Sequence, residues 1–148
     1  MSEAKPRRYA SDLMAGQVAL VTGSGSGMGR ATAIEMASCG ARLALFARRE
    51  EPLEETAEMI RAAGGEAFVV PGDTRDEVSI ETAMGRIKDH YGQLDVLVNN
   101  AGGQYIAAAR DITNKGFEAV IRNNLIGSWQ MTRAAADHFM YDLSLIHI

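Results

Sequence analysis

The sequence predicts an α/β fold, in which helices cover both faces of a doubly wound parallel sheet. Short apolar runs alternate with longer segments in which apolar residues recur at helical spacing, a pattern typical of stacked βαβ units. The runs are apolar almost throughout, as expected for strands that are buried on both faces. A chain of 148 residues, of which 47% are hydrophobic, is long enough to form one domain with its own core.

Four strands are expected, each followed by a helical segment. Glycines stand where the first three helices should end, at Gly40, Gly64 and Gly92, and would supply left-handed C-terminal caps. A fourth helical pattern, from residue 116 to residue 138, contains two asparagines, which are mediocre helix formers. The expected strands are residues 18–21, 43–46, 68–70 and 96–98.

The composition argues against several classes of function. The net charge is −4 and no concentrated basic surface is evident, so nucleic acid is not an expected partner. The sequence has no apolar run of about 18 residues, so no membrane span is expected. The single cysteine, Cys39, cannot form an internal disulfide, which makes the cytoplasm the expected compartment. No metal site is predicted.

A glycine-rich segment follows the first expected strand and leads directly into a helix-compatible stretch. A diphosphate is held well by free backbone N–H groups at a helix N-terminus, and glycines allow the backbone to approach it closely. The spacing is T-G-x-x-x-G-x-G, because G-x-G-x-x-G would need a glycine where Met28 stands. A glycine-rich turn without a ligand is the alternative. The candidate cofactor-binding residues are Thr22, Gly23, Ser24, Gly25, Ser26, Gly27, Met28 and Gly29.

The end of the second expected strand indicates which dinucleotide is preferred. An acidic residue there commonly binds the ribose of NAD(H), but Ala47 occupies the expected position and two arginines, Arg48 and Arg49, follow it. Guanidinium groups suit the 2′-phosphate of NADP(H), so NADP(H) is preferred and NAD(H) is possible. The alternative is that the two arginines form a solvated turn, paired with the glutamates that follow them.

A second motif, N-N-A-G, stands at the end of the fourth expected strand and comprises Asn99, Asn100, Ala101 and Gly102. In this order and spacing, T-G-x-x-x-G-x-G and N-N-A-G resemble the short-chain dehydrogenase/reductase family. The resemblance extends over residues 14–140 and implies a Rossmann-like fold with strand order 3-2-1-4, which would be truncated after the helix that follows the fourth strand. In the family this loop passes the cofactor, which makes Asn100, Ala101 and Gly102 candidate cofactor-binding residues.

The same resemblance suggests roles for further residues. It places Asp73 at the position that contacts the adenine ring, with Thr74 beside it, although an aspartate there is equally expected as a turn or cap residue. It places Arg48 beside the ribose. It aligns Asn124 with the asparagine that organises a bound water in the proton relay, which makes Asn124 the candidate catalytic residue. Its neighbour Asn123 is expected to face solvent.

The family's chemistry also requires a serine and a Tyr-x-x-x-Lys pair, which are not found: no tyrosine has a lysine four residues after it. We therefore expect a flexible leader (residues 1–15), an incomplete dinucleotide-binding domain (16–142) and a non-native tail (143–148). The six tail residues match the translation of a transposon-end sequence that is common in sequencing adapters. As it stands, the chain is expected to be inactive.

The sequence thus favours an NADP(H)-dependent oxidoreductase that acts on a small-molecule carbonyl, alcohol or enoyl thioester and forms a homo-oligomer when full length. Within the family, the segment from residue 100 to 116 resembles trans-2-enoyl-CoA reductases and citronellol-type dehydrogenases. A non-catalytic dinucleotide sensor or scaffold domain is the alternative. Another doubly wound nucleotide binder, such as a methyltransferase, is disfavoured by N-N-A-G.

Overall fold

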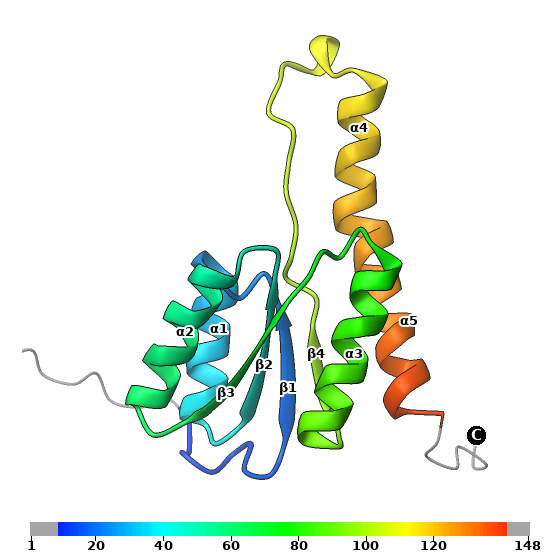
Figure 1. The fold of residues 1–148 in the computed structure, drawn as a ribbon. Helices are drawn as coiled ribbons and strands as arrows, with labels where there is room; N and C mark the ends of the chain where they lie inside the picture. The colour runs from blue at the N-terminus through cyan, green and yellow to red at the C-terminus, as the bar shows by residue number, and fades with distance from the viewer. Residues whose placement is uncertain (1–8, 142–148) are drawn as a thin grey trace, which may run out of the picture.

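A parallel sheet of four strands, in the order β3-β2-β1-β4, forms the centre of the computed structural model, which describes residues 9–141 (Figure 1). This confirms the predicted Rossmann-like α/β fold. The strands are β1 (Val18–Thr22), β2 (Arg42–Ala47), β3 (Glu66–Pro71) and β4 (Val96–Val98). The α-helices are α1 (Gly27–Ser38), α2 (Glu50–Ala62), α3 (Glu77–Tyr91), α4 (Asn114–Ile121) and α5 (Gly127–Phe139), with a short 3-10 helix, η1 (Ala109–Asp111), before α4.

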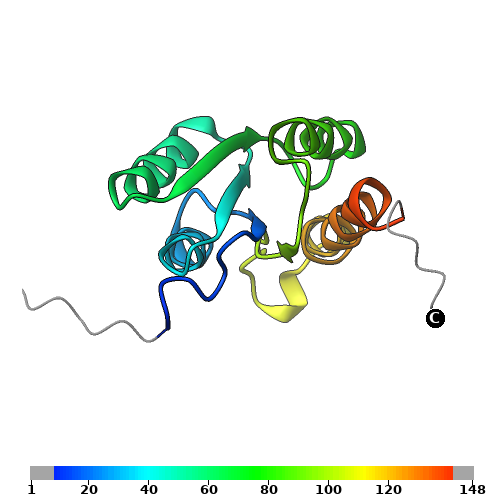
Figure 2. The ribbon, with the colours of Figure 1, turned by 90° about the horizontal axis from the view of Figure 1, so that it is seen from below.

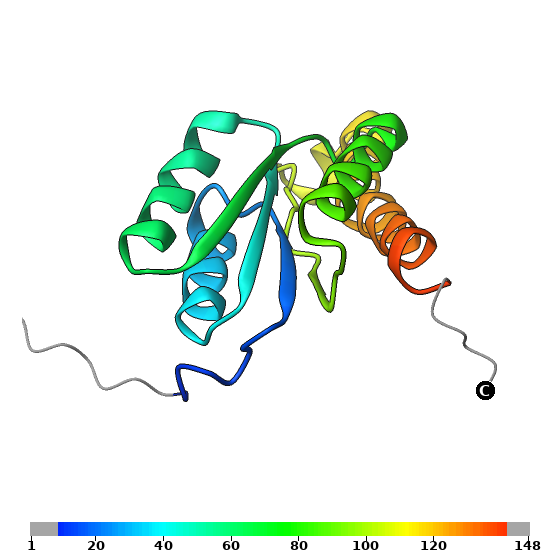
Figure 3. The same cartoon turned by 60° about the horizontal axis from the view of Figure 1, so that its bottom comes forward.

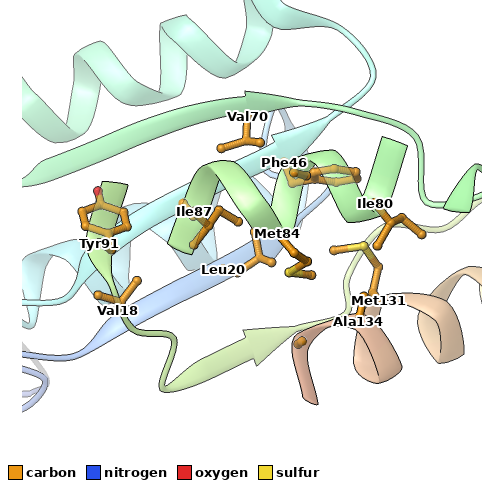
Figure 4. Packing of buried hydrophobic residues seen from close by; sticks show 13 residues of the cluster. Val18, Leu20, Phe46, Val70, Ile80, Met84, Ile87, Tyr91, Met131 and Ala134 are labelled. Carbon is orange, nitrogen blue, oxygen red and sulfur yellow. The ribbon is translucent and has the colours of Figure 1, made fainter. Parts of the chain in front are cut away.

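Helices cover both faces of the sheet, with α1 and α2 on one face and α3 and α5 on the other (Figures 2 and 3). Successive residues of a strand point to opposite faces, so β1 contributes to two cores. Val18 and Leu20 pack against α3 and α5, and Ala19 and Val21 pack against α1 and α2. Figure 4 shows the first core, in which Met131 of α5 is fully buried near side chains of α3. Helices bury both faces of the sheet, which explains why the strand sequences are apolar almost throughout.

The three glycines expected to end the first three helices all adopt the left-handed conformation. Their φ angles are 94° at Gly40, 86° at Gly64 and 73° at Gly92. At Gly92 the backbone N–H donates to the carbonyl of Lys88, which closes the last turn of α3. This prediction is confirmed.

The helix expected over residues 116–138 is interrupted. A π-helical turn, η2 (Arg122–Ile126), separates α4 from α5. The Asn124 amide Nδ2 donates to the carbonyl of Val120 at 2.8 Å, which takes the acceptor that a regular helix would give to the Asn124 backbone. A side chain that competes with the backbone in this way explains why the two asparagines lie where the helical hydrogen bonding changes.

Part of the segment expected as a flexible leader packs against the domain. Residues 11–16 form turns, and the Met14 backbone N–H donates to the Cys39 carbonyl at 2.8 Å. The Met14 side chain packs against the core between the sheet and α1 and α2. The packed domain therefore begins before residue 16, the predicted boundary. Residues 1–8 and the predicted non-native tail, 143–148, lie outside the described residues.

No helix among residues 9–141 combines the length and the apolar character needed to cross a membrane. The α4 helix and the loop before it project beyond the carboxyl ends of the strands, as Figure 1 shows. Because the loops after all four strands emerge at that same end, it is where a ligand site is expected in an open parallel sheet.

The Thr22 side chain, only 1% exposed, joins the ends of β1 and β4. Its Oγ1 donates to the Val98 carbonyl at 3.2 Å and accepts from the backbone N–H groups of Asn100 at 3.0 Å and Ala101 at 2.8 Å. One hydroxyl therefore satisfies two backbone donors of the loop after β4, in a position that water does not reach.

Replacing Thr22 by valine should destabilise the protein. The Thr22→Val side chain has nearly the same shape but leaves the Ala101 N–H without an acceptor and the Asn100 N–H with only the Val98 carbonyl, which should lower the free energy of unfolding by about 1–3 kcal/mol. Urea unfolding of the parent and the variant measures this difference. Thr82→Val is the control, because the Thr82 hydroxyl is exposed and bonds only within its own helix, so its effect should stay within about 0.5 kcal/mol. Equal losses in both variants would contradict this role for Thr22.

Candidate cofactor-binding site

The loops that follow the four strands enclose a cleft of about 360 Å³ at the carboxyl edge of the sheet. In the sheet, β1 lies between β2 and β4, so the strand order reverses at β1. The cleft lies at this position, which is the switch point of the topology. Its volume is within the range of small-molecule sites. The lining residues are Gly23, Gly25, Ser26, Met28, Gly29, Phe46, Ala47, Arg48, Arg49, Pro52, Gly72, Asp73, Thr74, Asn100, Ala101, Gly102 and Asn123.

The glycine-rich bend can form only because its residues lack side chains at the points of closest approach. A Cβ atom on Gly29 would collide with the carbonyl oxygen of Gly23, and one on Gly23 would lie 2.9 Å from Nδ2 of Asn100. Gly23 also has a φ of 69°, which favours glycine. The first turn of α1 therefore packs directly on the end of β1, and the bend carries the chain past the N-N-A-G loop.

The N-terminus of α1 faces the cleft with few groups to satisfy it. Ser26 is the N-cap residue, yet its side chain accepts no bond from the helix, and the first turn carries no acidic residue. The first backbone N–H groups of a helix lack internal acceptors and carry a partial positive charge. With the glycine cradle, this donor set fits a bound diphosphate.

The two arginines line the cleft at the end of β2 and are exposed. Neither forms an ion pair with any residue in the described range 9–141, so the predicted alternative, pairing with Glu50 or Glu51, is not what the structure shows. Ala47 also lines the cleft, at the position where an acidic residue was expected for NAD(H). The end of β2 therefore presents two arginines that have no ion-pair partner among the described residues.

Asp73 lies at the cleft and also makes the turn contact that the sequence allowed as an alternative. It lines the cleft, and its carboxylate also accepts from the Arg75 side chain, with Nη2 2.6 Å from Oδ2, and from the Arg75 backbone N–H at 3.0 Å. The hydrogen bond from the Arg75 side chain holds the pKa of Asp73 below its usual value, against an opposing effect of burial. The positive charge of Arg48 contributes in the same direction. The carboxylate is therefore ionised at neutral pH.

The N-N-A-G motif holds the neighbouring strands together. The Asn100 Nδ2 group donates to the Thr22 carbonyl at 2.9 Å, and the Asn99 Nδ2 group donates to Oγ1 of Thr132 in α5 at 2.9 Å. Asn100, Ala101 and Gly102 line the cleft. A Cβ atom on Gly23 would lie 3.1 Å from Cα of Ala101, so this loop lies directly against the glycine-rich bend.

The two asparagines of η2 have different surroundings, and Asn123 does not lie where it was expected. Asn123, expected to face solvent, lines the cleft. Asn124 does not line it; its side chain bonds to the backbone of Gly103, donating from Nδ2 to the carbonyl at 2.7 Å and accepting at Oδ1 from the N–H at 3.2 Å. Asn124 thereby anchors the loop after β4 to the helix. The π turn changes which side chains the helix presents to the cleft.

Twelve of the fifteen predicted cofactor-binding residues line the cleft, and the other three, Thr22, Ser24 and Gly27, do not. Thr22 and Ser24 are buried behind the bend, where Thr22 joins the strands and the Ser24 hydroxyl has no partner among the described residues. Sequence reasoning missed Phe46, Pro52 and Gly72, which lie at strand ends or in the first turn of a helix. The only feature of the sequence that could have identified them is their position at the end of a strand or in the first turn of a helix. No cluster of three potential metal ligands occurs within residues 9–141.

Comparisons with known proteins agree with this geometry. The chain is 35% identical over 127 residues to a peroxisomal 2,4-dienoyl-CoA reductase of Arabidopsis thaliana, which covers 86% of this chain and 43% of that protein. It resembles the structure of a citronellol catabolism dehydrogenase of Pseudomonas aeruginosa, with a TM-score of 0.85, 38% identity, and coverage of 90% of this chain and 54% of that one. A metagenomic short-chain oxidoreductase in complex with NADP gives a TM-score of 0.79 and 36% identity, over 84% and 57% of the two chains.

The chain spans about half the length of the curated relatives that it matches. A dienoyl-CoA reductase and a citronellol catabolism dehydrogenase are thus both among the similar proteins, which supports the resemblance to the subgroup of enoyl-CoA reductases and citronellol-type dehydrogenases. The family model of the short chain dehydrogenases matches residues 17–144, most of the chain. With the glycine-rich bend, the N-N-A-G loop and the sheet order, this match establishes that the chain belongs to the short-chain dehydrogenase/reductase family.

Proposed function

We propose that this chain forms the NADP(H)-binding part of an oxidoreductase that acts on a carbonyl, an alcohol or an enoyl thioester. The observation that carries the proposal is the cleft at the carboxyl edge of the sheet, where the free N-terminus of α1 lies opposite two unpaired arginines. A diphosphate and a phosphate monoester are both anions, and each finds a positive partner there.

Different residues of the cleft would bind different parts of the cofactor. The backbone of Gly25, Ser26 and Met28 would hold the diphosphate, and Arg48 with Arg49 would hold the 2′-phosphate. Asp73, kept ionised by Arg75, would accept a hydrogen bond from the adenine amino group. When bound, the nicotinamide supplies or accepts hydride. The other lining residues of this region, Thr74, Asn100, Ala101 and Gly102, would bound the adenine and nicotinamide ends.

The preference for NADP(H) over NAD(H) rests on charge. An acidic side chain at Ala47 would attract the ribose hydroxyls and repel a phosphate, and none is present. The similarity to an oxidoreductase that was solved in complex with NADP supports the same choice. Similarity to a dienoyl-CoA reductase and a citronellol catabolism dehydrogenase supports the substrate classes. We also propose that Asn124 contributes to the proton relay from its place in η2, where its side chain bonds to the loop after β4.

Removing the Arg48 side chain should weaken NADP⁺ binding selectively. Loss of a charge-assisted contact to the 2′-phosphate should raise the dissociation constant for NADP⁺ roughly tenfold and leave that for NAD⁺ nearly unchanged. Isothermal titration of the parent and Arg48→Ala with both dinucleotides measures this. Arg133→Ala is the matched control, because Arg133 lies on α5 outside the cleft and pairs with Asp137. A parent protein that binds both dinucleotides equally would contradict the proposed preference.

The preference for NADP⁺ over NAD⁺ should also decrease as the pH is lowered. A phosphate monoester loses one of its charges as the pH drops through about 6, whereas Asp73, whose pKa is lowered, stays ionised. The affinity ratio between NADP⁺ and NAD⁺ should therefore be larger at about pH 7.5 than at about pH 5.5. In Arg48→Ala the ratio should change less. An affinity ratio of the parent protein that is the same at both pH values would refute the proposed role of Arg48 and Arg49.

A further inference from the structure

Arg30, in the first turns of α1, contacts the glycine-rich bend and the start of α2 together. Its Nη2 group donates to the Gly25 carbonyl at 2.5 Å and to the Pro52 carbonyl at 3.2 Å, and its Nε group donates to Oγ1 of Thr56 at 2.9 Å. Gly25 and Pro52 line the cofactor cleft, but Arg30 itself does not. Arg30 therefore reaches the cleft only through the backbone of other residues.

Thr56 completes this arrangement from α2. It is fully buried, and its hydroxyl lies 3.0 Å from the carbonyl oxygens of both Ser24 and Pro52. The Ser24 and Gly25 carbonyls, the two consecutive acceptors of the bend, are thus both bound on the α2 side. An ion pair between Arg30 and Glu55, 2.7 Å long and with Glu55 54% exposed, adds little by itself. The buried and partly buried contacts to backbone oxygens are the stronger constraint.

These contacts determine where the amides of the bend point. In a planar trans peptide, the carbonyl of one residue and the N–H of the next point in opposite directions. A Ser24 carbonyl held by Thr56 therefore turns the Gly25 N–H away from α2, and a Gly25 carbonyl held by Arg30 turns the Ser26 N–H the same way. Gly25 and Ser26 line the cleft, so both donors are prepared for an anion before it binds.

The same contacts fix the distance between two parts of the cleft. Pro52 stands in the first turn of α2, the helix that begins directly after Arg48 and Arg49. A Cβ atom on Gly25 would lie 3.0 Å from the Cβ of Pro52, so the bend and the helix are already in contact. Arg30 bonds to a carbonyl on each side of that contact and so prevents the two loops from separating.

We propose that Arg30 is a positioning residue that holds the diphosphate loop and the arginine pair in one rigid unit, and so sets both the affinity for dinucleotides and the preference for NADP⁺. This inference rests on the proposed function. Misaligned amides would weaken the diphosphate contacts common to NADP⁺ and NAD⁺. A loop free to move from α2 would additionally weaken the simultaneous binding of the 2′-phosphate, which only NADP⁺ carries.

The test is a set of calorimetric titrations of the full chain with NADP⁺ and NAD⁺. Arg30→Met should raise both dissociation constants about tenfold or more, a loss of about 1.4 kcal/mol for each factor of ten, and should lower the ratio that favours NADP⁺. Arg30→Lys should recover part of the affinity, because a lysine can donate to the Gly25 carbonyl but cannot reach all the acceptors at once. Thr56→Val should raise both dissociation constants by a smaller factor.

Arg61→Met is the matched control. Arg61 also joins a carboxylate, Glu54, to a backbone carbonyl, that of Ala67, but it lies outside the cleft. It should lower the melting temperature without changing either dissociation constant, which separates positioning from a general loss of stability. If Arg30→Met does not fold, Arg30→Lys and Thr56→Val carry the test.

The possible failures are distinguishable. A parent protein that binds neither dinucleotide overturns the proposed function and this inference together. A parent that binds NADP⁺ preferentially, with folded Arg30 and Thr56 variants of unchanged affinity and unchanged preference, overturns only the role of Arg30. Equal effects of Arg30→Met and Arg61→Met on binding would also overturn it.

Discussion

The close approach of α1 to the end of β1 is the constraint on which the rest of the site depends. Gly29 lies so near the Gly23 carbonyl that no side chain fits between them, and Asn100 closes the same gap from the loop after β4. This contact brings the N-terminus of a helix to the switch point of a parallel sheet, with its first N–H groups exposed to the cleft. Arg48, Arg49, Asp73 and the N-N-A-G loop then surround the N-terminus of this helix, whose position is set by the backbone contact.

Backbone polar groups on the buried side of the bend are paired within the protein, whereas the backbone N–H groups on the cleft side are available to a ligand. Thr22 satisfies the N–H groups of Asn100 and Ala101, and Arg30 with Thr56 satisfies the carbonyls of Ser24 and Gly25. Once these groups are paired within the protein, the donors that remain on the cleft side are those an anion can use. Such preorganisation lowers the free energy needed to order the loop on binding.

Features encoded by local chemistry could be predicted from the sequence. The apolar strands, the glycine caps and the glycine-rich bend were predicted because each depends on residues adjacent in the chain. The arginine pair was predicted from its position after β2. The position of Asn123 at the cleft could not be predicted, because periodicity assumes 3.6 residues per turn and the π turn η2 breaks that phase.

Features that depend on contacts between distant residues were also out of reach. The packing of Met14 on the core and the contact of Arg30 with Pro52 join segments that periodicity treats separately. From the sequence, Arg30 is an ordinary polar residue early in a helix. Thr22 was predicted to bind cofactor because it belongs to the motif, whereas its hydroxyl joins β1 to β4. A motif identifies which residues belong together, but it does not distinguish those that contact a ligand from those that support them.

The most direct measurement of the central claim is an NMR titration of the ¹⁵N-labelled chain with NADP⁺, in which each backbone amide reports its own environment. The account predicts that the largest shift changes occur at Gly25, Ser26 and Met28 in the bend, and at Arg48 after β2. Binding of NADP⁺ that leaves these amides unchanged and shifts a different surface would contradict it.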